Sequence, residues 1–190
     1  MKNLIIYAHP NPKSFNRAIL MNIQQRLAQL NRSFIERDLY ALNFDPVLKA
    51  ADLAAIQQGN TPADIAQEQA YIKEAKTIIF IHPIWWFGMP AILKGYIDRV
   101  FSYGFAYAAK DGKISGLLTD KRVFVFNTTG GNELTYNQAG FNQGLKTTMD
   151  NGIYGFCGMK VEKHVFFYEV PTINKTQREA MLLQIKAMEF

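Results

Sequence analysis

The sequence predicts an α/β fold, namely a single domain with a doubly wound, five-stranded parallel sheet and helices on both faces. Apolar strand-like runs alternate five times with helical segments along 190 residues, which is the pattern of repeated strand–helix units. The runs at 3–8 and 77–83 are apolar almost throughout, as expected of strands buried on both faces. No linker or internal repeat interrupts residues 1–190, so we expect one domain.

The elements are assigned in chain order from these patterns. Residues 3–8 predict the first strand, and the apolar four-residue repeat in 14–30 predicts a helix with Ser14 as its N-cap. Thr176 and Glu179 are a candidate capping box for the last helix. Further strands are expected at 33–39, 77–83, within 121–131 and at 160–170, further helices at 46–58, 62–75, 90–103, 141–151 and 175–189, and a hairpin at 108–116.

Composition limits the classes of partner. The formal net charge is +5, but Lys and Arg are scattered singly, so we do not expect nucleic acid as a ligand. The longest apolar stretch, Thr77–Leu93, is interrupted by His82, two prolines and a glycine, so it predicts no membrane span. The single cysteine, Cys157, excludes an internal disulfide and predicts a buried, inert thiol. We expect a cytoplasmic protein with no metal site.

Three unusual segments follow the first, third and fourth predicted strands, where ligands bind in open α/β sheets. The first, 9–16 (HPNPKSFN), leads into a helix whose N-terminal amides favour phosphate, although Ser14 could serve only as a cap. The third, 127–136 (NTTGGNELTY), has two glycines that permit close approach of a ligand or form only a tight turn. No G-x-G sequence occurs, so neither a dinucleotide fingerprint nor a P-loop is expected.

The second segment, 82–90 (HPIWWFGMP), carries the only two tryptophans of the chain. Pro83 ends the strand and Pro90 suits the first turn of a helix. Trp86 and Phe87 could stack on a planar heterocycle. Alternatively, these aromatic residues could cover the sheet end against a neighbouring subunit, and both uses can coexist.

Seven segments in order carry a resemblance to a known family. They are YAHPNPKSFN, RDLYALNFDP, DIAQEQ, HPIWWFGMPAILKGYIDRVF, FAYA, NTTGG and FCG. They resemble the NAD(P)H:quinone oxidoreductases with a flavodoxin-like fold, which include DT-diaphorase and ancillary subunits of glutathione-gated potassium efflux systems. The resemblance implies a homodimer with flavin sites at the interface. It also implies that hydride passes from NAD(P)H to flavin N5, and then to a quinone or similar flat acceptor in a two-electron ping-pong cycle.

The resemblance also implies roles for individual residues. His9, Ser14, Phe15 and Asn16 would hold the flavin phosphate, and Arg178 would contact a phosphate. Tyr136 would hydrogen-bond the reduced flavin, and Tyr107 would cover the substrate pocket of the partner subunit together with Trp86 and Phe87. The ring and ribityl chain would be lined by Pro83, Ile84, Trp85, Trp86 and Phe87, and the polar edge of the ring by Thr128, Thr129, Gly130 and Gly131.

One position departs from the family pattern. DT-diaphorase has a histidine six residues after the site tyrosine, whereas this chain has Asn142. Asn142 is a candidate catalytic residue, because an amide donates hydrogen bonds, but it does not become cationic, so whether it replaces the histidine as a proton relay stays open. Charge developing on the flavin would then be stabilised by Tyr136 and by amides near Gly130 and Gly131. His82 is not expected to replace the missing histidine.

Two alternatives remain open at this stage. The chain could be a regulatory flavoprotein subunit of a membrane potassium-efflux system, and thus a peripheral partner of a transporter. A flavodoxin-like electron shuttle fits poorly because such carriers are usually acidic. The cofactor is expected to be FAD, because the region NTPADIAQEQ resembles one that reaches toward the adenosine half in diaphorases, but FMN is possible.

Overall fold

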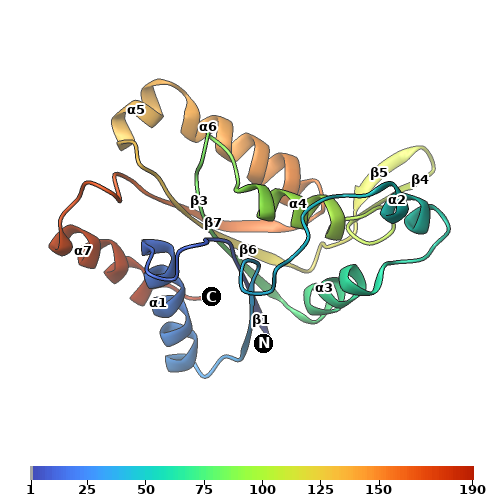
Figure 1. Cartoon of the computed structure of the whole chain (residues 1–190), viewed down its shortest axis with the longest axis horizontal. Coiled ribbons are helices and arrows are strands. Elements are labelled where there is room, and N and C mark those ends of the chain that lie inside the picture. The colour runs from blue at the N-terminus through green and yellow to red at the C-terminus, as the bar shows by residue number, and fades with distance from the viewer. Residues whose placement is uncertain (1) are drawn as a thin grey trace.

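A parallel sheet of five strands forms the centre of the molecule (Figure 1). The computed structural model describes residues 2–190. The strand order is β2-β1-β3-β6-β7, and every neighbouring pair is parallel. The chain moves from β1 to β2 on one side and then crosses to β3 on the other, so the sheet is doubly wound as predicted. The strands are β1 (Asn3–Tyr7), β2 (Phe34–Asp38), β3 (Thr77–Pro83), β6 (Arg122–Thr128) and β7 (Lys160–Phe167).

Helices cover both faces of this sheet. On one face lie α1 (Phe15–Gln29) and α7 (Lys175–Lys186), which contact each other. The other face is covered by α3 (Ala63–Glu74), α4 (Ala91–Val100), α6 (Phe141–Lys146) and the π-helix η1 (Thr147–Gly155). The chain also contains α2 (Ala50–Gln57), the short α5 (Glu133–Gln138) and an antiparallel hairpin of β4 (Tyr107–Lys110) and β5 (Lys113–Gly116).

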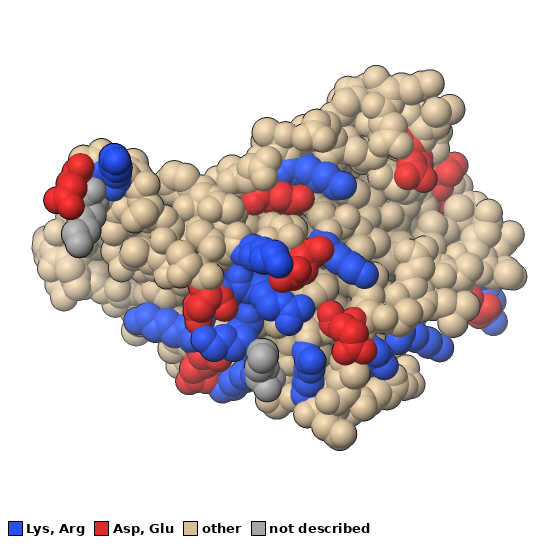
Figure 2. Space-filling view, turned by 180° about the vertical axis from the view of Figure 1, so that it is seen from behind, with Lys and Arg blue, Asp and Glu red and all other residues tan. Residues whose placement is uncertain are grey.

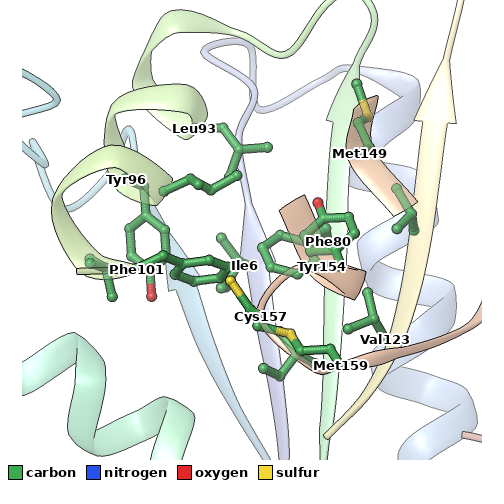
Figure 3. Close-up of a cluster of buried hydrophobic side chains, with 14 of the residues drawn as sticks. Ile6, Phe80, Leu93, Tyr96, Phe101, Val123, Met149, Tyr154, Cys157 and Met159 are labelled. Atoms are coloured by element: carbon green, nitrogen blue, oxygen red, sulfur yellow. The ribbon is translucent and has the colours of Figure 1, made fainter. Parts of the chain in front are cut away.

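Alternate residues of the strands supply two apolar cores. Ile5 and Tyr7 pack with Ile19 and Ile23 of α1 under one face. Ile6 and other residues on the opposite face pack under α3, α4 and η1 (Figure 3). Cys157 belongs to this second core, where burial raises the pKa of its thiol to about 11. The predicted burial of this cysteine is therefore confirmed.

The helix predicted at 141–151 takes a different form. It is α-helical only to Lys146 and continues as a π-helix to Gly155, closed by a hydrogen bond from Phe156 N–H to Asn151 O (2.9 Å). The wider turn brings Met149 and Tyr154 into the core, where the Tyr154 ring stacks on Phe80 at 4.7 Å. Apolar spacing does not distinguish such a turn from an α-helical one, and π-turns of this kind often mark functional sites.

The predicted capping box of the last helix is wrong by two residues. Asn174, in an extended conformation, is the N-cap of α7 and accepts a hydrogen bond from Gln177 N–H at 2.9 Å. The Gln177 side chain accepts one in return from Asn174 N–H at 3.0 Å. Asn is a better N-cap than Thr, so the helix begins earlier than the Thr176 pattern indicates.

Charged side chains of both signs are interspersed on the molecular surface. On the face shown in Figure 2, Lys and Arg side chains lie among Asp and Glu side chains rather than in a patch of one sign. Lys76 pairs with Asp120, and Arg17 pairs with Glu36. The charged side chains gather in the lower middle of this face, and the two signs alternate there. Within residues 2–190, no helix is both long and apolar enough to cross a membrane.

Candidate functional site

The three segments singled out in the sequence meet in one pocket at the carboxyl ends of β1, β3 and β6. Its volume is about 430 Å³. The pocket lies where the strand order reverses, which is the position at which ligands bind in doubly wound sheets. It is lined by His9, Phe15, Asn16, Pro83, Ile84, Trp85, Trp86, Thr128, Thr129, Gly130, Val170 and Pro171.

The segment after β1 forms the start of helix α1. The Ser14 hydroxyl oxygen accepts a hydrogen bond from Arg17 N–H at 3.2 Å and lies 3.2 Å from the Tyr7 hydroxyl. Ser14 therefore caps the helix, and its hydroxyl does not line the pocket. His9 does line it, in edge contact with the Trp85 ring at 5.7 Å. Partial burial lowers the pKa of His9, which favours its neutral form at pH 7.

Asn16 links the first segment to the third. Its side-chain amide donates a hydrogen bond to the Thr128 hydroxyl at 2.8 Å, at the end of β6. Its carbonyl oxygen, Oδ1, is buried and has no hydrogen-bond partner among the described residues. A buried acceptor without a partner costs free energy, so this atom is available to a ligand that donates a hydrogen bond.

The segment after β3 makes a strained two-residue turn. Trp85 and Gly88 exchange two backbone hydrogen bonds, of 3.0 and 3.1 Å. The central residues Trp86 and Phe87 both have positive φ, +50° and +55°. Large aromatic residues rarely adopt this conformation, which costs about 1–3 kcal/mol per residue. The Trp86 side chain is 97% exposed, so the turn presents an uncovered ring at the mouth of the pocket.

The segment after β6 carries the two glycines. A Cβ on Gly130 would meet nothing within 4 Å, whereas one on Gly131 would come within 2.7 Å of the Tyr136 ring. Gly130 lines the pocket and Gly131 does not. The Thr129 hydroxyl donates to Gly131 O at 2.8 Å, which fixes the loop so that Gly130 faces the open space.

Several predicted residues lie outside this pocket. The ring centroid of Phe87 lies 3.9 Å from that of Phe141 and 5.6 Å from that of Tyr136. Phe87 and Tyr136 therefore belong to an aromatic cluster behind the loop. Tyr136 is buried, which raises the pKa of its hydroxyl. Asn142 donates to Asn137 Oδ1 at 2.6 Å and lines a separate polar pocket with His164 and Tyr168. The structure therefore does not bring Asn142 to the pocket.

Two more predicted residues are not among those that line the pocket. Tyr107 lies on the β4–β5 hairpin, in ring contact with Tyr103 and Phe156. A single chain does not test its expected role in the pocket of a partner subunit. Arg178 lies in α7, and its Nε is buried without a hydrogen-bond partner among residues 2–190. This donor is therefore available to an anionic group.

Two lining residues were missed by the sequence analysis. Val170 and Pro171 follow β7, and Val170 N–H donates to Thr129 O at 3.1 Å, which holds this loop against the third segment. The carboxyl end of β7 lies at the same edge of the sheet as those of its neighbours. The proline immediately after the fifth strand was therefore the signal that could have identified this wall.

Comparisons with known proteins give the same result as the geometry. The model of the flavodoxin-like fold family matches residues 1–188. A Haemophilus influenzae protein called an uncharacterized NAD(P)H oxidoreductase is 40% identical over 96% of this chain and 91% of its own length. The chain belongs to the NAD(P)H:quinone oxidoreductase family, with a flavodoxin-like fold. The resemblance inferred from the sequence is thereby confirmed, as is the expectation of an oxidoreductase.

Further members of the family support this assignment. Rat ribosyldihydronicotinamide dehydrogenase [quinone] is 32% identical over 95% of this chain and 87% of its own length. The structure of an NAD(P)H:quinone oxidoreductase from Methanothermobacter marburgensis superposes with a TM-score of 0.89 at 28% identity, over 98% of this chain and 95% of that one. The likeness to the family thus covers the whole sheet and all three loops of the pocket.

Proposed function

We propose that this chain is a flavin-dependent NAD(P)H:quinone oxidoreductase whose flavin lies in the pocket at the ends of β1, β3 and β6. The observation that carries the proposal is the turn at Trp86 and Phe87. Backbone strain persists only where the surrounding structure enforces it, and it concentrates at ligand clamps. A turn that holds two aromatic residues in the left-handed region at the mouth of such a pocket fits a planar ligand.

The polar groups of the site fit a flavin and its phosphate. The first amides of α1 point toward the loop at 9–14, and a helix N-terminus favours an anion. Asn16 Oδ1 is buried without a partner among the described residues, so it would accept a hydrogen bond from a hydroxyl of the ribityl chain. We propose that the start of α1, with His9, Phe15 and Asn16, holds the phosphate end, while Ser14 fixes the start of the helix. Arg178, which does not line the pocket, stays a candidate for a phosphate contact.

The opposite end of the pocket suits the ring. A bound flavin would supply the redox chemistry, accepting a hydride from NAD(P)H and delivering two electrons to a flat acceptor such as a quinone. The backbone amide at Gly130 would face the polar edge of the ring, where fixed dipoles stabilise negative charge. Pro83, Ile84, Trp85 and Thr128 would line its length, as their position in the pocket supports.

We propose FAD as the cofactor in preference to FMN. A second pocket of about 380 Å³ adjoins the first and shares His9 with it. Its lining includes the rings of Tyr7 and Tyr40 and the charged side chains of Arg17 and Asp38. The additional nucleotide half of FAD would have room there, whereas FMN would leave this pocket empty. Chromatography of the flavin released from purified protein distinguishes the two.

We also propose that the active form is a homodimer. Trp86 and Phe87 are exposed on the turn at the mouth of the pocket, and Tyr103 and Phe156, also exposed, contact Tyr107 of the β4–β5 hairpin. Exposed aromatic surface can mark an interaction site. A second copy would cover these rings and bring its Tyr107 over the substrate. Sedimentation of the purified chain tests the assembly, and a monomer with full activity would contradict it.

The regulatory alternative is less well supported. The relatives described above are named as oxidoreductases and dehydrogenases, so we favour catalysis over regulation of a potassium-efflux protein. Pull-down from membrane extracts combined with turnover measurements separates the two. A stable complex with a transporter and negligible turnover would favour regulation.

The proposed function is tested by purifying the protein and recording its visible spectrum. We expect flavin absorption, bleaching on addition of NADH or NADPH, and recovery of the spectrum on addition of menadione. The same preparation should oxidise NAD(P)H continuously when menadione is present. Protein that is folded but neither contains nor takes up flavin would contradict the proposal.

Tyr136→Phe is expected to slow reduction of the flavin by roughly tenfold to a thousandfold, the range for loss of one donor from an oxyanion hole. Tyr136 lies directly behind Gly131, so its hydroxyl is the side-chain donor that a small shift of the loop would bring to the ring. Stopped-flow measurement of the flavin absorbance checks the rate. Tyr168→Phe, a change of the neighbouring ring at 5.8 Å, is the control. An unchanged rate in Tyr136→Phe would remove Tyr136 from the proposed machinery.

A further inference from the structure

Three buried polar side chains lie side by side on β3, β6 and β7, near the carboxyl ends of β3 and β6. His82 and Asn127 are register partners on β3 and β6, and both are fully buried. The His164 side chain on β7 is only 2% exposed. Burial of polar groups is costly unless they are hydrogen-bonded. Most other buried residues of β3 and β6 are apolar, so such a row requires an explanation.

The hydrogen bonds of the row have one consistent direction. The backbone carbonyl of His82 can only accept a hydrogen bond. The atom of the Asn127 amide that lies 3.2 Å from His82 O must therefore be the donor, Nδ2. The second N–H of that amide then donates to His82 Nε2 at 3.0 Å. His82 must therefore carry its proton on Nδ1, from which it donates to Pro83 O at 2.9 Å. Burial lowers the pKa of His82 to about 4, which keeps the ring neutral as this arrangement requires.

The outer half of the row follows from the same assignment. Asn127 Oδ1 faces His164 Nε2 at 2.6 Å, so His164 donates there. His164 Nδ1 lies 2.7 Å from Asp150 Oδ1 on η1. Both of those atoms would accept if neither carried a proton, so the pair shares one. The result is a continuous row of hydrogen bonds that runs from Asp150, at its outer end, to the carbonyl of Pro83.

The inner end of this row of hydrogen bonds, at Pro83, is part of the pocket wall. Pro83 and Ile84 line the pocket, and Ile84 N–H donates to Thr128 O at 2.8 Å. The peptide group between Pro83 and Ile84 is thus held on both sides, by His82 at its oxygen and by β6 at its nitrogen. The strained turn of Trp86 and Phe87 begins two residues later. Strain of that kind needs a rigid anchor.

We infer that Asn127, held between His82 and His164, is a positioning residue that anchors the aromatic turn in its flavin-binding conformation. The inference rests on the proposed function, because it assigns Asn127 to the same pocket. Asn127 does not line the pocket itself, so it acts through the Pro83–Ile84 peptide. Polar partners behind a ligand commonly fix its contacts in this manner, and their loss weakens metal binding by about tenfold to a hundredfold.

Asn127→Leu is the test, because leucine has a similar volume and forms none of these hydrogen bonds. We expect its dissociation constant for the proposed flavin to rise by roughly tenfold to a hundredfold. The matched control is Asn3→Leu, which removes a buried asparagine from the opposite end of the sheet, where its amide donates to Ser33 O at 2.9 Å. The control is expected to lose stability but retain flavin affinity. Fluorescence titration with FAD and FMN measures binding, and urea unfolding measures stability.

Asp150 supplies a second pair of variants at the outer end, where folding is less at risk. Asp150→Leu leaves His164 Nδ1 without a partner, whereas Asp150→Asn still provides an amide donor for that atom. We therefore expect Asp150→Asn to bind flavin more tightly than Asp150→Leu. A merely structural contribution of the row would not produce this rescue by the conservative variant.

The tautomer of His82 gives a readout that needs no flavin. Nitrogen-15 NMR of the histidine rings at pH 7 should show His82 neutral with its proton on Nδ1. A proton on Nε2, or a charged ring, would overturn the assignment. A wild-type chain that binds no flavin would overturn the proposed function and this role with it. A wild-type chain that binds flavin no better than folded Asn127→Leu would overturn the positioning role alone.

Discussion

Gly130→Val should weaken flavin binding strongly while leaving the stability of the protein unchanged. Gly130 lines the pocket, and a Cβ there would meet no protein atom within 4 Å. The added side chain therefore has space in the free protein but would occupy the volume proposed for the ring. Overpacking costs about 1–3 kcal/mol, which corresponds to a roughly fivefold to 150-fold rise in the dissociation constant. Fluorescence titration and thermal unfolding measure the two effects separately.

Gly144→Val is the matched control for this variant. Gly144 lies in α6, where a Cβ likewise meets no atom within 4 Å, and it does not line the pocket. We expect it to keep wild-type flavin affinity. Gly130→Ala, with a single added methyl group, should lie between wild type and Gly130→Val. Full flavin occupancy in Gly130→Val would show that the ligand lies elsewhere.

The sheet and the position of the pocket could be predicted from sequence because each depends on local patterns. The apolar runs at 3–8 and 77–83 are buried on both faces of the sheet, and strand–helix alternation predicts a parallel sheet. Parallel strands end at a common edge, so the three unusual segments had to lie close together. Asn16 and Thr128, 112 residues apart, meet there in a hydrogen bond.

Features that depend on contacts between distant segments were missed. Trp86 and Phe87 do not resemble the Asn-Gly pairs that predict a turn with two positive φ values, so nothing local indicated the strain. The hydrogen-bonded row around His82 was missed because its side-chain partner Asn127 lies 45 residues away in sequence. His164 and Asn127 became its neighbours only through the register of β3, β6 and β7.

A second large effect is expected from Arg99→Ala, this time on stability. Arg99 of α4 is buried and bonds three separate segments: Asp52 of α2 through Nε at 2.9 Å, Asp64 of α3 at 2.8 Å and the carbonyl of Asp45 at 2.9 Å. Removing the guanidinium would leave the buried Asp52 carboxylate without its counter-charge. Loss of one partner from a buried pair costs about 3–5 kcal/mol. Urea unfolding at pH 7 measures the change in the free energy of unfolding.

The pH dependence of unfolding provides the control for this explanation. The hydrogen bond from Arg99 is the main cause that lowers the pKa of Asp52 in the folded protein. A carboxyl group with a lowered folded pKa stabilises the fold above its unfolded pKa of about 3.9. That stabilisation is lost as the pH falls through the folded value. The difference in the free energy of unfolding between wild type and Arg99→Ala should therefore become smaller in acid, because protonated Asp52 no longer needs a cation. A deficit that stays constant from pH 7 down to the acid transition would mean that lost packing, not the unpaired carboxylate, destabilises the variant.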